Sequence, residues 1–79
     1  PNPAHDRVWL RIALDEFASP TVLLYSSSGN CLKRYDHVGT LAPGIHTLEL
    51  PIEELPSGMY RVVVAAGMMH AQGVLVRVR

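Results

Sequence analysis

The chain has little of several features that define large classes of protein. It contains one cysteine, Cys31, so no internal disulfide can form and no cluster of cysteine thiolates can bind zinc. Its longest apolar run, residues 62–69, contains Gly67 and is far shorter than the roughly 20 residues that a membrane-spanning helix needs. We therefore expect neither a disulfide-stapled scaffold nor a transmembrane segment.

The chain also lacks an excess of charge of either sign. Seven Lys and Arg residues balance seven Asp and Glu residues, and the cations form no basic stripe that could follow a phosphate backbone. We therefore expect no nucleic-acid partner. Aromatic residues make up 6% of the chain, and Trp9, Tyr25, Tyr35 and Tyr60 all fall in predicted strands, which argues against the exposed aromatic platform of a sugar-binding module.

What the chain does contain is enough apolar material for one core. Hydrophobic residues make up 48% of its 79 residues, and a chain of this length forms one small domain rather than two. It opens at Pro1 without an initiator methionine or a secretory signal segment. We interpret residues 1–79 as a single domain cut from a longer parent chain.

Alternation of residues with a period of two is the dominant pattern along the chain. It predicts strands over residues 8–14, 21–25, 31–35, 45–50, 59–64 and 74–79, with a turn near residues 52–55. Residues 21–25 and 31–35 are expected to form a hairpin, and the last strand is expected to pair with residues 59–64. Because no window keeps helical spacing without Gly or Pro, the pattern predicts an all-β, immunoglobulin-like β-sandwich of about six or seven antiparallel strands.

No side chains form a catalytic or metal-binding set on spacing grounds. The four histidines lie far apart, with no pair at i and i+4. We expect a partly buried, hydrogen-bonded imidazole at His46, loop positions for His37 and His70, and a buried thiol at Cys31. The sequence therefore predicts no enzyme, no cofactor and no metal site.

Several short motifs follow one another in a characteristic order. They are an opening Pro1-Asn2-Pro3, a segment from Val22 that leads to Gly29, the segment that begins at Gly44, and the run Leu-Pro-Ser-Gly-Met-Tyr-Arg-Val that includes Gly58 and Tyr60. A valine-rich strand follows. This order, over essentially all 79 residues, resembles the C-terminal sorting domain of type IX secretion cargo, the type A "secretion tail" family of Bacteroidetes.

The resemblance implies an immunoglobulin-like sandwich that acts as a C-terminal secretion signal. Such a domain directs its parent protein through the type IX outer-membrane translocon, in transit through the periplasm, to the cell surface, outer membrane or extracellular space. The implied partners are the translocon, the sortase and attachment complex, and anionic lipopolysaccharide. The domain is either cleaved by the sortase or retained as a docking module of a surface attachment component. The alternative is an immunoglobulin-like accessory or spacer module of a secreted multidomain protein.

The C-terminal segment departs from the pattern of this family. Cargo domains commonly carry a lysine shortly before the last apolar strand and end in lysine, whereas here Gly73 precedes the strand and the chain ends in arginine. Arginine keeps the cation but presents a planar fork, and the departure favours a retained domain. A terminal strand at a sheet edge can be read by β-augmentation, so the candidate recognition residues are Val74, Val76, Arg77, Val78 and Arg79.

Overall fold

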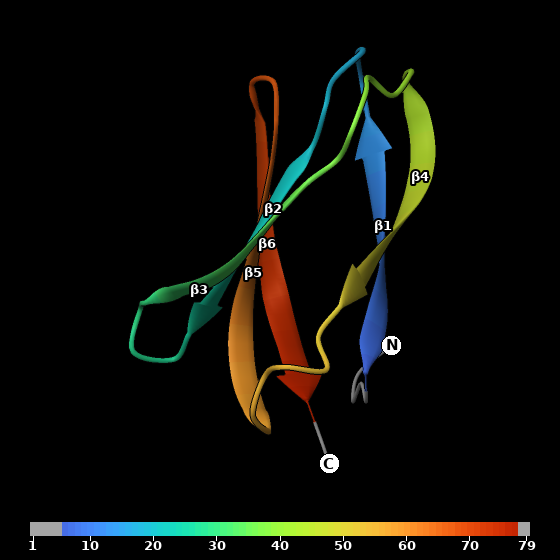
Figure 1. Cartoon of the computed structure of the whole chain (residues 1–79). Helices are drawn as coiled ribbons and strands as arrows, with labels where there is room; N and C mark the ends of the chain where they lie inside the picture. The colour runs from blue at the N-terminus through green and yellow to red at the C-terminus, as the bar shows by residue number, and fades with distance from the viewer. Residues whose placement is uncertain (1–5, 78–79) are drawn as a thin grey trace.

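A computed structural model describes residues 6–77, and all regular secondary structure in this range is β-strand. The strands are β1 (Arg7–Leu14), β2 (Thr21–Ser26), β3 (Cys31–Asp36), β4 (Gly44–Pro51), β5 (Gly58–Ala66) and β6 (Met69–Arg77) (Figure 1). Each pairing between them is antiparallel. The predicted all-β class, the hairpin of β2 and β3, and the pairing of the last strand with β5 are confirmed.

The strands form two sheets of unequal width. One sheet has four strands in the order β3-β2-β5-β6, and the other has two strands, β1 and β4 (Figure 1). A hydrogen-bonded bridge between Ala18 and Leu41 joins the two connections that link the sheets at one end. This arrangement is compatible with an immunoglobulin-like β-sandwich, as the sequence predicts.

The core lies between the facing sides of the two sheets. Every second residue of β1 from Val8 points into it, apart from Leu10, which packs at its margin, whereas Trp9 and Arg11 point outward. From the opposite sheet, Leu24 is completely buried. The remaining buried side chains come from both sheets and the connections: Ile12, Leu14, Ala18, Val22, Leu50, Ile52, Leu55, Tyr60, Val62, Val64, Ala66 and Leu75.

The last strand is longer than the sequence predicts. β6 begins at Met69, five residues before Val74, because it pairs with β5 without interruption from Ala66 opposite Met69 to Gly58 opposite Arg77. His70 consequently lies within β6, so its expected loop position was wrong. Ala71 and Gly73 have low β-propensity, and hydrogen bonding to the neighbouring strand decides their conformation instead.

Cys31 is exposed, so the prediction of a buried thiol was wrong. The cause is a register shift in the β2–β3 ladder between Leu24 and Tyr25. The shift pairs Cys31 with Tyr25, whose ring lies on the outer face of the sheet beneath the Arg61 guanidinium, 4.9 Å from the ring centre. A bulge of this kind moves one side chain from one face of a strand to the other.

Candidate recognition surface

The C-terminal candidate residues lie on β6 as far as the structure describes them. β6 is the last strand of the four-stranded sheet, with β5 beside it. Leu75 is buried and Val74 is 56% exposed on the opposite face, as their alternation predicts. Val78 and Arg79 lie outside the described residues. The recognition role of residues 74–79 stays a prediction.

Arg77 is held against the fold rather than extended into solvent. Its Nε donates a hydrogen bond of 2.7 Å to the carbonyl of Leu55, and one terminal nitrogen donates at 3.4 Å to the carbonyl of Glu53. The other terminal nitrogen, Nη1, is buried and has no hydrogen-bond partner. Arg77 therefore ties the end of β6 to the turn over residues 52–55, a contact that no local sequence pattern could have indicated.

That turn takes the form that the sequence predicts. The amide of Leu55 donates a 3.0 Å hydrogen bond to the carbonyl of Ile52, and both side chains are buried. On the exposed side of the same turn, Lys33 of β3 forms an ion pair with Glu54 at 2.5 Å. The hydrogen bond from Lys33 lowers the pKa of the Glu54 carboxyl and the same contact raises the pKa of the lysine.

The motif around Tyr60 forms a corner at the start of β5. The Tyr60 ring is 6% exposed, and its hydroxyl donates a short hydrogen bond to the carbonyl of Pro56, four residues upstream. This is the arrangement of the tyrosine corner that immunoglobulin-like sandwiches use to fix a connection between strands. Gly58, between the two partners, has φ of 154°, which a residue with a Cβ rarely adopts.

The remaining family-motif residues divide into two groups. Gly44 begins β4 with φ of 131°, and Gly29 lies in the turn between β2 and β3 with φ of 94°. Gly44 and Gly58 therefore adopt backbone conformations that are unfavourable to residues with a Cβ. Pro1, Asn2 and Pro3 lie outside the described residues.

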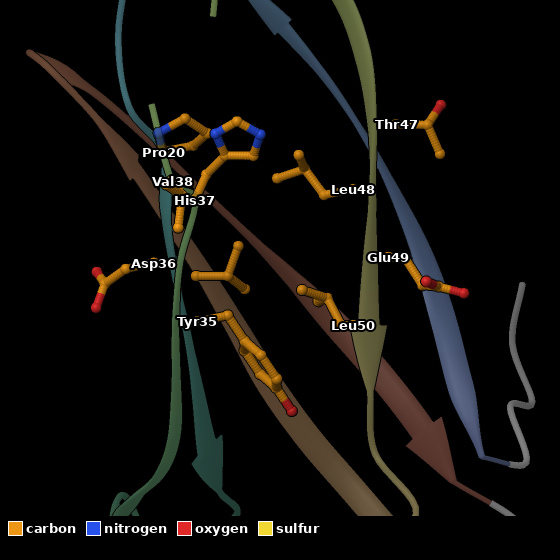
Figure 2. Close-up of a pocket in the computed structure, with 10 residues that line it drawn as sticks. Pro20, Tyr35, Asp36, His37, Val38, Thr47, Leu48, Glu49 and Leu50 are labelled. Carbon is orange, nitrogen blue, oxygen red and sulfur yellow. The ribbon is translucent and has the colours of Figure 1, made fainter. Parts of the chain in front are cut away.

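A hollow of about 450 Å³ opens between β3 and β4 (Figure 2). Tyr35 and Leu48 reach into it, whereas Asp36 points away. The hydroxyl of Tyr35 donates a 2.7 Å hydrogen bond to the carbonyl of Pro51, and burial raises the pKa of the phenol. This contact joins β3 to the end of β4, so a hydrogen bond links the two sheets at one end of the hollow.

The charged groups near this hollow are engaged with one another on the outer surface. Arg34 contacts Asp36 at 3.0 Å, and the hydroxyl of Thr21 donates to the same carboxylate at 2.8 Å. These two hydrogen bonds lower the pKa of Asp36, and the one from Arg34 has the larger effect. A carboxylate held ionised and turned away from the hollow is not placed to exchange protons with a bound molecule.

The histidines are positioned by backbone contacts. His46 is partly buried, and its Nε2 lies 2.7 Å from the carbonyl of Ala42, which confirms the predicted hydrogen-bonded imidazole. His37 lies in the connection after β3, as predicted, with Nδ1 3.3 Å from the carbonyl of Gly39. Over residues 6–77, no group of three or more His, Cys, Asp or Glu side chains is arranged to hold a metal ion.

An apolar slot runs along the opposite flank of the sandwich, between β1 and β6. It has two adjoining compartments of about 330 and 150 Å³, which share Leu10, Val62 and Val74. The larger compartment extends toward Met69 and the smaller toward Val8, Trp9 and Leu75. Sequence reasoning did not find this slot, because it depends on which strands flank each other across the two sheets.

Helices that could span a membrane are absent from the part of the chain that the structure describes.

Comparison with known proteins gives one match. A sequence model of the family described as "secretion system C-terminal sorting domain" matches residues 1–76, which include the whole described fold except Arg77. No curated protein and no solved structure matches the chain.

Proposed function

The chain belongs to the family of type IX secretion system C-terminal sorting domains, and we propose that it is read by the outer-membrane translocon and carries its parent protein to the cell surface. Membership makes it a sorting module that serves as a C-terminal secretion signal for export to the surface or the extracellular space. The observation that carries the proposal is the extent of the match, because residues 1–76 include β1 to β5 and all of β6 except Arg77.

The proposed route begins in the periplasm, where the folded domain meets the translocon. We propose that residues 74–79 form the segment that is read, through main-chain pairing and the side chains of the terminal strand. The position of β6 at the end of the four-stranded sheet supports this reading. The cations at Arg77 and Arg79 would add specificity, with Arg77 acting where β6 meets the turn over residues 52–55.

For the fate of the domain after export, we propose retention rather than cleavage by the sortase. The support is the sequence of the last strand, where Gly73 stands in place of the usual lysine and arginine supplies the cation. A retained domain would dock its parent to the attachment complex, with anionic lipopolysaccharide as a further partner. Export followed by cleavage would yield the same surface signal but a smaller product.

The test fuses residues 1–79, with their native upstream linker, to a fluorescent reporter exported to the periplasm of a host that has the type IX machinery. We expect surface fluorescence that disappears in a strain without the translocon. A blot of the product then distinguishes full-length mass, expected for retention, from loss of the domain. Equal periplasmic retention in both strains would contradict the sorting role and favour an accessory module.

A pair of deletions separates recognition from folding. Removing residues 76–79 removes Arg77 and its hydrogen bonds to the turn, so lost export could reflect an unfolded domain. Removing residues 78–79 alone leaves those contacts in place. We expect both deletions to reduce export, and unchanged export after the longer one would refute recognition through the terminal strand.

A further inference from the structure

We infer that the apolar slot between β1 and β6 is the docking site for an extended segment of a partner protein, which adds a strand to the free edge of β1. The inward side chains of this segment would be apolar and cover Val62 and Val64, and an outward acidic side chain would lie opposite Arg11. The inference rests on the proposed function, since it assigns a second contact with the machinery that exports the domain.

The unequal widths of the two sheets create the edge. β1 pairs with β4 on one side, and among residues 6–77 no strand pairs with its other side. The slot is lined by the consecutive residues 10–13 of β1 and 71–74 of β6, so the strand edges themselves form its walls. A strand eight residues long with one unpaired edge offers a row of main-chain donors and acceptors to a further strand.

The slot between β1 and β6 exists because β6 carries small residues where it faces the core. Ala71 and Gly73 stand opposite Val64 and Val62 of β5 on the inward side, between the larger Met69 and Leu75. A Cβ built at Gly73 would meet no atom within 4 Å, and this glycine does not have a positive φ. The backbone therefore does not require glycine there, and its effect is to keep the slot open.

The size and lining of the slot suit aliphatic side chains. The larger compartment alone, at about 330 Å³, reaches the lower end of the range of roughly 300 to 1,000 Å³ found for ligand clefts. Its floor is Val62 and Val64, and Leu10 and Ile12 flank it. A strand laid along β1 would direct every second side chain onto this floor and the others outward.

The positive charge of Arg11 on the outer face of β1 favours a partner segment with an acidic residue. Arg7 is neutralised by Glu49 at 2.6 Å, whereas Arg11 forms no ion pair with any residue that the structure describes. A strand next to β1 would place one outward side chain directly across from Arg11, and opposite charges at such cross-strand positions are stabilising. The complementary occupant is a segment that alternates apolar residues with polar ones and carries an acidic residue near its middle.

The same charges disfavour a second copy of this chain as the occupant. If two β1 strands paired antiparallel with Trp9 opposite Trp9, Arg7 of each would face Arg11 of the other. Shifting the register to centre on Arg11 would set the two Arg11 side chains against each other. Like charges directly opposite are destabilising, and the register centred on Leu10 would set Arg11 opposite Trp9 without an acidic group. An acidic segment therefore complements this edge better than a copy does.

Binding can be measured through Trp9, the one tryptophan of the chain, which is 49% exposed and lines the smaller compartment. The probe is a seven-residue peptide in which valine alternates with threonine and the central threonine is replaced by glutamate. We expect a saturable blue shift of tryptophan emission, and weaker binding by at least tenfold when lysine replaces the glutamate. No saturation at peptide concentrations up to 1 mM, or equal binding of both peptides, would overturn the inference.

Gly73→Leu tests the slot itself by filling it from the side of β6. Because the site is open and the backbone unstrained, we expect the variant to fold with an unchanged or higher urea midpoint and to lose peptide binding at least tenfold. The matched control is His70→Leu, on the outward face of the same strand, which should bind as the unmodified chain does. A folded Gly73→Leu variant with full binding would refute the docking site.

Arg11→Glu tests the charge preference and should reverse it, so that the lysine peptide binds more tightly than the glutamate peptide. Self-association of the chain through β1, seen as a dimer by light scattering and abolished by Gly73→Leu, would replace the proposed partner with a second copy. The reporter assay distinguishes the two proposals. Translocon-dependent export that is unaffected by Gly73→Leu would leave the sorting role intact and refute this contact. Absent export of the unmodified fusion would refute the sorting role, and peptide binding alone would then test the docking site.

Discussion

Tyr60 illustrates how much one side chain contributes to the closure of this small sandwich. Its ring fills the core while its hydroxyl reaches the carbonyl of Pro56, so it fixes both the packing of β5 and the path of the chain that leads into it. The hydroxyl group and the ring can be tested separately, because a phenylalanine retains the ring.

Tyr60→Phe should destabilise the fold by about 1 kcal/mol, because it removes one hydrogen bond and leaves a partly buried carbonyl without its donor. The measurement is the free energy of unfolding from urea titration. Tyr25→Phe is the matched control, since the Tyr25 ring contacts Arg61 through its face and this contact does not need the hydroxyl. Equal losses in both variants would show that the Pro56 contact contributes nothing specific.

Asp36 gives the fold a predictable response to acid. Hydrogen bonds from Arg34 and Thr21 lower its pKa, so its contribution to stability is complete above the ordinary carboxyl pKa and is lost as the pH falls through the lowered value. Arg34→Gln should raise the pKa of Asp36 toward its ordinary value, as measured by NMR titration of the carboxyl carbon. Arg11→Gln, on the other sheet, should leave it unchanged, and an identical shift in both would contradict the assignment.

Among the strands, β5 and β6 show what alternation can and cannot predict. Residues 59–64 and 74–79 are predicted as strands because valines alternate or cluster there, and their pairing follows from the short turn at Gly67. Residues 69–73 carry no such pattern. They form a strand because β5 supplies hydrogen-bond partners along its whole length, and this information lies outside the segment itself.

Substitution by alanine at two glycines of these strands should change the stability of the fold in opposite directions. Gly58→Ala places a Cβ at φ of 154° and should cost about 1 to 3 kcal/mol. Gly73→Ala, at an open site without positive φ, should be neutral or should stabilise the strand by about 0.5 to 1 kcal/mol. Urea midpoints of the two variants decide this, and a loss of stability at Gly73 would mean that its backbone is more constrained than its surroundings indicate.

At the level of the whole molecule, stability depends on a core with few members. Leu24 is completely buried, and Leu24→Ala should cost about 2 to 5 kcal/mol. A domain of this length has a total stability of only about 0.05 to 0.15 kcal/mol per residue, so this loss is a large share of the total and should clearly lower the urea midpoint followed by circular dichroism. Val38→Ala, at a side chain that is 92% exposed, should change the free energy of unfolding by less than about 0.5 kcal/mol.

The sequence predicted the strands and their faces well, and the candidate site less well. The inward positions of β1 and the hydrogen-bonded His46 follow from local alternation, which the chain itself displays. The division into sheets of four and two strands does not follow from local alternation, because β1 pairs with β4, a strand that lies far from it in the sequence. The slot beside β6 and the contact of Arg77 with Leu55 both result from that division, so neither could be foreseen.

The pairing of β1 with β4 also determines how quickly the domain can form. Its ladder joins residues from Leu14 with Gly44 to Arg7 with Pro51, so the two ends of the intervening chain must meet, at a cost in entropy, before these hydrogen bonds form. Sandwiches with such distant pairings fold in roughly milliseconds to seconds. Trp9, on β1, should report this step as a slow phase in stopped-flow refolding. A newly made, unfolded chain would therefore keep β1 unpaired for roughly milliseconds to seconds, a period in which another protein can bind this strand.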